Sequence, residues 1–153
     1  SIMEKELKVA ALRNGTVIDH IPADKLYQVV FMLHLDTCDN QITIGNNLES
    51  AKIGKKGIIK IAGKVFAEDE TNKIALIAPN AKINIIKDYQ VIEKRPLSLP
   101  DEIHEIAQCN NPNCITNHQN ISTFFNVIKD ETGTMLKCHY CERLIKLEEV
   151  KIK

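Results

Sequence analysis

Four cysteines near the C-terminal end constrain the fold of this chain more than any other feature. Cys109 and Cys114 enclose four residues, Cys138 and Cys141 enclose two, and 23 residues separate the pairs. Each pair can offer two thiolates from one tight turn, and four thiolates suit the tetrahedral coordination of zinc. Because the surrounding segment has few large apolar side chains, we expect one structural ion to stabilise its fold.

Other roles for these cysteines stay open at this point. They can form two disulfides in an exported protein, hold an iron–sulfur cluster, or use Cys138 and Cys141 as a redox pair. His118 or His139 can replace one thiolate. We favour zinc because the first residues lack the apolar core of a signal peptide, which predicts a cytoplasmic protein. Four protein ligands would leave no open position for a zinc hydrolase.

A proline-rich segment divides the chain. Pro96 and Pro100 each remove a backbone donor, so neither a helix nor a central strand is expected to cross this point. We therefore predict one domain over residues 1–100 and a second over 101–153. The 20 basic and 20 acidic residues balance, which argues against a protein that coats nucleic acid by its global charge. Apolar runs such as 29–33 are too short to span a membrane.

The first hundred residues alternate between strand and helix periods. Strands are predicted at Leu7–Ala11, after which Gly15 turns the chain, and around Ile42–Ile44, Ile59–Ile61, Ile83–Ile85 and Val91. Helices are predicted over 26–33 and around Ile74–Ala78, the second entered through the acidic residues 68–70. This order is β-α-β-β-α-β and predicts an antiparallel sheet with two helices on one face, an α+β fold.

The second domain is predicted to be small and rich in β-structure. Ile121, Thr123, Phe125 and Val127 alternate, and residues 130–133 supply a turn to a second strand. Ile145 and Leu147 indicate a further strand. Cys38, the fifth cysteine, stands alone and is interpreted as a plain thiol.

Polar residues within apolar stretches of the first domain suggest an anion or nucleotide site. Asp19 and His20 interrupt one extended segment, and Asn84 lies between isoleucines. A carboxylate can hold ribose hydroxyls, whereas histidine and lysine can meet phosphates. The alternative is a solvated basic surface. A run of lysines without an intervening acid adds to this group: Lys52, Lys55, Lys56, Lys60 and Lys64.

Several motifs resemble the regulatory chain of aspartate carbamoyltransferase over nearly the whole sequence. They are Gly15-Thr16-Val17-Ile18-Asp19-His20-Ile21, Ile42-Thr43-Ile44-Gly45, Gly54-Lys55-Lys56 and Asn111-Pro112-Asn113-Cys114-Ile115, together with the two cysteine pairs. The resemblance implies a ferredoxin-like allosteric domain followed by a zinc domain, with no catalysis by this chain. It also implies regulatory dimers that bridge catalytic trimers in pyrimidine biosynthesis, inhibited by CTP and UTP and activated by ATP.

The resemblance further implies roles for individual residues. Asp19 and Lys60 would hold sugar and base, His20 and Lys94 would face the phosphates beside Asn84, and the base pocket would be lined by Val9, Ala11, Leu12, Val17, Ile86, Tyr89 and Val91. Asn111, Asn113 and Glu142 match positions that contact the catalytic chain, and Cys109, Cys114, Cys138 and Cys141 would bind zinc. Glu6 replaces a basic residue near the nucleotide, so a second, metal-linked nucleotide is not implied.

A second hypothesis is a zinc-ribbon module that binds nucleic acid beside a ligand-sensing domain. Such a ribbon should be basic and carry aromatic residues. Residues 101–153 hold 6 basic and 8 acidic side chains, which argues against this hypothesis.

Overall fold

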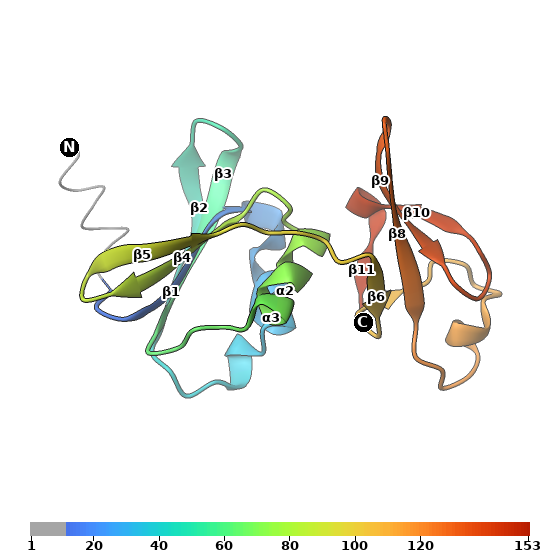
Figure 1. Cartoon of the computed structure of the whole chain (residues 1–153), viewed down its shortest axis with the longest axis horizontal. Coiled ribbons are helices and arrows are strands. Elements are labelled where there is room, and N and C mark those ends of the chain that lie inside the picture. The colour runs from blue at the N-terminus through green and yellow to red at the C-terminus, as the bar shows by residue number, and fades with distance from the viewer. Residues whose placement is uncertain (1–11) are drawn as a thin grey trace. The chain divides into compact units, whose positions relative to one another are not determined.

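The computed structural model describes residues 12–153, and the chain divides after Ser98 into two compact units (Figure 1). Within the described residues, the first unit holds a five-stranded sheet, and the second holds a four-stranded sheet and a two-stranded ladder. No helix among residues 12–153 is both long and apolar enough to cross a membrane.

The sheet of the first unit has the strand order β2-β3-β1-β4-β5, and neighbouring strands are antiparallel. Helices α2 and α3 cover one face of it (Figure 1). The order β1-α2-β2-β3-α3-β4 confirms the predicted α+β fold, and β5 extends the sheet at one edge. The bounds are β1 Gly15–Pro22, α2 Leu26–Met32, β2 Ile42–Ser50, β3 Gly54–Ala62, α3 Glu68–Asn72, β4 Lys82–Lys87 and β5 Gln90–Arg95.

The core of this unit lies between the sheet and its helices. Ile18 on β1 pairs with Ile59 on β3 and Ile83 on β4, and all three side chains are buried. Leu26 and Val29 on α2 are fully buried as well. Because side chains alternate along a strand, the residues next to each of these isoleucines on its own strand point to the opposite face of the sheet.

One predicted strand lies outside the described residues, and the second helix differs from the sequence prediction. The strand that occupies the first place in the fold is Gly15–Pro22, whereas the strand expected at Leu7–Ala11 lies outside the described residues. The second helix is α-helical only over Glu68–Asn72 and continues as a 3-10 turn, Lys73–Leu76. Residues 74–78 are all buried in succession. A one-sided amphipathic α-helix does not bury every consecutive side chain, so this segment is packed on several sides.

The second unit consists of short strands around the cysteine turns. Its larger sheet has the order β10-β9-β8-β6, and β7 pairs with β11. The turn predicted at residues 130–133 joins β8 and β9, with Asp130 Oδ1 accepting a bond from the Thr132 N–H. The bounds are β6 Glu102–His104, β7 Ala107–Gln108, β8 Phe124–Asp130, β9 Gly133–Cys138, β10 Leu144–Lys146 and β11 Lys151–Ile152.

Candidate functional site

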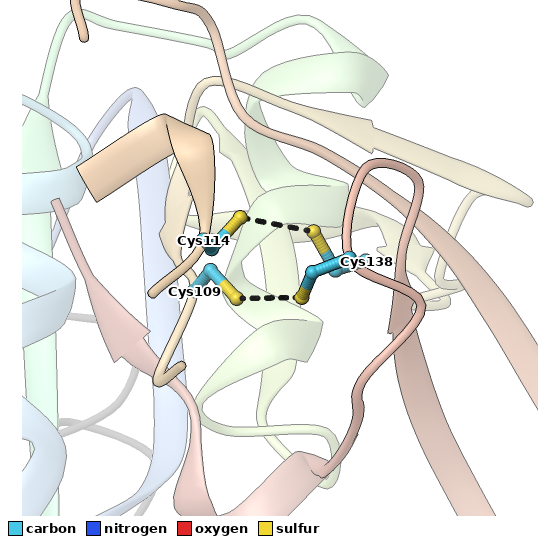
Figure 2. Close-up of side chains that lie close together, drawn as sticks. Cys109, Cys114 and Cys138 are labelled. Carbon is cyan, nitrogen blue, oxygen red and sulfur yellow. Dashed lines mark hydrogen bonds between the residues drawn. The ribbon is translucent and has the colours of Figure 1, made fainter. Parts of the chain in front are cut away.

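The four clustered cysteines converge within the second unit. Their Sγ atoms all lie within 4.8 Å of one another. Cys109 Sγ lies 3.6 Å from Cys141 Sγ. Cys114 Sγ lies 3.8 Å from Cys138 Sγ (Figure 2). A disulfide needs about 2.05 Å, whereas sulfurs at about 2.3 Å from a central zinc are separated by about 3.8 Å. The cysteines are therefore free thiols whose spacing fits a tetrahedral metal site.

Short turns with backbone hydrogen bonds present these sulfurs. In the second turn the N–H groups of Tyr140 and Cys141 donate to the Cys138 sulfur, and the Glu142 N–H donates to the Cys138 carbonyl at 2.9 Å. In the first turn the Asn111 N–H donates to the Cys109 sulfur. Such bonds orient metal ligands and stabilise their thiolate form.

Asn111 and Asn117 close the first turn. Asn111 Oδ1 accepts from the Asn113 N–H at 3.0 Å, and the Asn111 carbonyl accepts from the Cys114 N–H at 3.0 Å. The Asn117 side-chain amide donates to the carbonyls of Cys109 and Asn111 at 2.9 and 2.8 Å. The Asn-Pro-Asn sequence therefore folds this loop from its own side chains.

The acidities of the thiols differ within the cluster. Burial raises the pKa of Cys109 to about 12, and burial also raises the pKa of Cys138. Burial opposes ionisation of Cys141 too, but hydrogen bonds from the Asn111 side chain and the Arg143 N–H outweigh it and lower its pKa to about 7. Several thiolates at this spacing require a cation to compensate their charge, and a divalent metal supplies it.

Neither nearby histidine joins the sulfur cluster. The His118 ring bonds to the Pro112 carbonyl at 2.7 Å, and the His139 ring stacks on Phe124 with centroids 4.5 Å apart. Among the described residues, only the four cysteines form a group of possible metal ligands. The predicted contact residues of the second unit lie beside this cluster: Asn113 and Glu142 are exposed and Asn111 is half-buried. The fifth cysteine, Cys38, lies in the first unit.

A row of paired residues crosses the helix-free face of the first unit's sheet. Lys60 on β3 pairs with Val17 on β1, Val17 pairs with Asn84 on β4, and Asn84 pairs with Lys94 on β5. Thr43 on β2 continues the row beyond Lys60. At about 4.8 Å between strands, Lys60 and Lys94 lie about 14 Å apart on this face. Strand register therefore brings together residues far apart in the sequence.

A bulge in β1 positions Asp19 and His20 at one end of this face. The register shifts between Ile18 and Ile21, and His20 has a positive φ of 60°. Asp19 is 7% exposed, and its Oδ1 lies 3.0 Å from Lys56 Nζ and accepts the His20 N–H at 2.6 Å. Because the bulge inserts one extra residue into β1, the side chains next to it no longer follow the regular alternation between the two faces of the sheet.

The charges on this face perturb its bases. Burial lowers the pKa of His20; Asp19 opposes this shift, while nearby lysines add to it. Burial also lowers the pKa of Lys60, again against Asp19. The pKa of Lys82 is lowered chiefly by the positive charge of Lys52. Lysines that repel one another at this spacing would be stabilised by a bound anion.

Two cavities lie along this face and share Thr43 and Lys60. The larger, of about 710 Å³, is lined by His20, Lys52 and Lys56 together with the apolar Ile44, Leu48 and Ile58. The smaller, of about 330 Å³, is lined by Leu12, Tyr89 and neighbours. Small-molecule sites occupy about 300–1,000 Å³.

The predicted nucleotide residues occupy several environments. Val17 and Ile86 are buried, Asn84 is half-buried, and Tyr89, Val91 and Lys94 are exposed. Val9 and Ala11, like Glu6, lie outside the described residues. Sequence reasoning named Lys56 within the lysine run but did not select Thr43 or Leu48 for this site. Only the lysine run signalled Lys56, because its contact with Asp19 depends on the bulge in β1.

Comparison with known proteins gives matches to both units. The protein-family model described as the aspartate carbamoyltransferase regulatory chain, allosteric domain, matches residues 7–98. The model of the metal binding domain of the same chain matches residues 101–151.

Similar proteins share most of the length of this chain. The aspartate carbamoyltransferase regulatory chain of Parabacteroides distasonis is 56% identical, covering 98% of this chain and 97% of the relative. The regulatory chain of Phocaeicola vulgatus is 52% identical, covering 97% and 96%. That of Pyrococcus abyssi is 49% identical, covering 95% and 96%. The chain therefore belongs to the family of aspartate carbamoyltransferase regulatory chains, non-catalytic subunits with an allosteric domain and a metal-binding domain.

Proposed function

We propose that this chain binds the nucleotides CTP, UTP and ATP in residues 1–100 and controls a catalytic partner through residues 101–153. It acts in the cytoplasm as a regulatory dimer that bridges catalytic trimers in pyrimidine biosynthesis. A single structural zinc ion shapes the surface that contacts the catalytic chain.

The helix-free face of the first unit's sheet carries the lysines described above and is called the basic face here. This basic face is the observation that carries the nucleotide proposal. Its row Lys60–Val17–Asn84–Lys94 places an apolar contact and an amide between two ammonium groups. A nucleotide carries groups that can meet these side chains, because its planar base packs on apolar surface and its phosphates attract ammonium groups. The base would lie toward the smaller cavity, which Leu12 and Tyr89 line, and Lys60 would reach base or sugar.

The other end of the face suits the rest of the nucleotide. Asp19 accepts hydrogen bonds and can hold ribose hydroxyls, although Lys56 Nζ already lies 3.0 and 3.3 Å from its two oxygens. His20, Lys52 and Lys56 line the larger cavity, and Lys82 lies close to Lys52. These cationic groups would attract phosphates by charge-assisted hydrogen bonds.

The cysteine cluster supports zinc as the metal. Four sulfurs at tetrahedral spacing match the donor set that zinc prefers in closed structural sites. When bound, zinc would hold the two turns together and contribute its binding energy to the fold. Asn111, whose side chain braces the Asn113 N–H, and the neighbouring Glu142 would then present fixed polar groups to the catalytic chain.

Control requires nucleotide and partner to be coupled through a conformational equilibrium. A nucleotide shifts this equilibrium only by its difference in affinity for the two states, and coupling energies of about 1–3 kcal/mol are typical. Activator and inhibitor would therefore contact the basic face differently, and the second unit would present different contacts to the catalytic chain.

Assembly tests the proposal. Sedimentation of the chain with catalytic trimers should give a larger complex than either component, and elemental analysis should find one zinc per chain. Complete removal of metal should abolish the complex. Assembly that persists without metal would contradict the role of zinc, and no complex under any condition would contradict the partner.

A further inference from the structure

The Arg95 side chain joins the end of β5 to the segment that precedes α3. Its Nη1 donates to the carbonyl of Phe66, a residue that is 1% exposed. The Arg95 side chain is itself 11% exposed. A guanidinium that is mostly buried and bonded to a backbone carbonyl holds its strand more firmly than an exposed one does.

Arg95 and its neighbour Lys94 point to opposite faces of the sheet. Lys94 pairs with Asn84 on the basic face, whereas Arg95 pairs with Ile83, which is buried in the core. Successive strand residues alternate between faces, so one strand end carries both a candidate phosphate contact and an anchor to the core. Any displacement of β5 at Lys94 displaces Arg95 as well.

Hydrogen bonds also connect the segment around Phe66 to β1, and they connect the chain after Arg95 to α3. Thr16 Oγ1 on β1 donates to the Lys64 carbonyl at 2.7 Å, two residues before Phe66. Beyond Pro96, the Ser98 N–H donates to Asn72 Oδ1 at the end of α3, at 3.3 Å. Residues 64–72 therefore form a bridge from the nucleotide-bearing strands to the point where the chain leaves the first unit.

We propose that Arg95 is the positioning residue that carries the effect of a nucleotide from Lys94 to residues 96–98, where the chain leaves the first unit. This inference rests on the proposed nucleotide site. Phosphates drawn to Lys94 shift the end of β5, Arg95 transmits this shift to the Phe66 carbonyl, and the bridge moves the Asn72 contact with Ser98.

A second acceptor near Arg95 gives this contact two possible arrangements. Arg95 Nε is buried and has no hydrogen-bond partner among the described residues, and Glu93 Oε1 lies 3.6 Å away. A rotation of either side chain that brings these atoms within hydrogen-bond distance would give Arg95 a second bond beside the one to the Phe66 carbonyl. Switching elements of this kind act through discrete alternatives rather than continuous deformation.

Amide exchange of the full-length, zinc-loaded chain tests the inference. In the wild type, saturating CTP should change the exchange rate of the Ser98 amide by about fivefold or more, the lower range of allosteric coupling. In Arg95→Ala the change should fall below about twofold, while the CTP dissociation constant stays within about threefold of wild type. Asn72→Ala should lose the Ser98 response in the same way, because it removes the acceptor.

Gln90→Ala, at the exposed other end of β5, is the matched control and should keep the full response. Arg95→Lys keeps the charge but loses the planar fork, so it decides the case if Arg95→Ala does not fold. A full Ser98 response in Arg95→Ala, or in Arg95→Lys where Arg95→Ala does not fold, would overturn the inference, and so would no response in a wild type that binds CTP. Absence of CTP binding by the wild type would instead refute the proposed function.

Discussion

Lys56 Nζ lies 3.0 Å from Oδ1 of Asp19, and this ion pair joins β3 to the bulge of β1. The two side chains are 21% and 10% exposed, so water screens the pair only partly. Lys56 therefore neutralises Asp19, and among the described residues Lys52, Lys60 and Lys82 form no ion pair.

Lys60→Ala should weaken CTP binding by about tenfold or more, because charge-assisted hydrogen bonds contribute about 1.5–3 kcal/mol. Zinc content should not change, since Lys60 lies in the other unit. Lys87→Ala, at the exposed end of β4, is the matched control. Equal affinities of wild type and Lys60→Ala in a calorimetric titration would show that the nucleotide binds elsewhere.

CTP binding should be accompanied by proton uptake at His20. Burial holds its pKa below the ordinary value, so His20 is mostly neutral near pH 7 in the free chain. Bound phosphates favour the protonated ring, so affinity should rise as the pH falls from 8 to 6. Calorimetry in buffers of different ionisation enthalpy measures the uptake. His20→Gln should remove this component, and an unchanged uptake in that variant would assign the proton to another group.

His20 also makes the stability of the free chain depend on pH. Because its folded pKa is lowered, the unfolded chain binds this proton more readily, and the contribution to stability is lost as the pH falls through about 6.5. Wild type should therefore lose stability below that pH more steeply than His20→Gln. Parallel curves of the free energy of unfolding against pH would contradict the assignment.

Gly15→Ala should lower the free energy of unfolding by more than about 2 kcal/mol. An added Cβ would lie 2.0 Å from the Ile61 carbonyl oxygen, and Gly15 has a φ of +143°. Gly54→Ala is a matched control, because Gly54 has a φ of +82° but nothing lies within 4 Å of its Cβ position. It should cost only about 1 kcal/mol from backbone strain. Equal losses in urea unfolding would show that the contact with Ile61 is unimportant.

Cys114→Ser should release the metal and unfold the second unit while CTP binding by the first unit persists. The Cys114 sulfur is buried and lies 3.8 Å from that of Cys138, so its loss opens the coordination shell. We expect the NMR resonances of residues 99–153 to lose the chemical-shift dispersion of β-structure. The CTP titration should be unchanged. A variant that retains one metal per chain and its fold would contradict the four-sulfur site.

Local patterns in the sequence were enough to predict most of the fold. Ile59 and Ile61, or Ile83 and Ile85, alternate because one sheet face is buried, and this period needs no tertiary information. The 3-10 turn over Lys73–Leu76 was not predictable in this way, because consecutive burial depends on what packs around it. The strand predicted at Leu7–Ala11 lies outside the described residues, and the described sheet begins with Gly15–Pro22.

The candidate sites differ in how far the sequence predicts them. The cysteine spacing indicates a metal site because ligand geometry is local to each turn. The basic face depends on register, which places Lys60 and Asn84 on either side of Val17 although 23 residues separate them in sequence. The contact of Lys56 with Asp19 requires the bulge, and no local pattern predicts it.

Aspartate saturation of the reconstituted complex, recorded alone, with CTP and with ATP, tests the central claim most directly. We predict that the two nucleotides shift the half-saturating aspartate concentration away from the nucleotide-free value, and that the Lys60→Ala complex responds less. Superimposable curves under all three conditions would contradict a regulatory role for nucleotides bound to this chain, even if the complex assembles with its full complement of zinc.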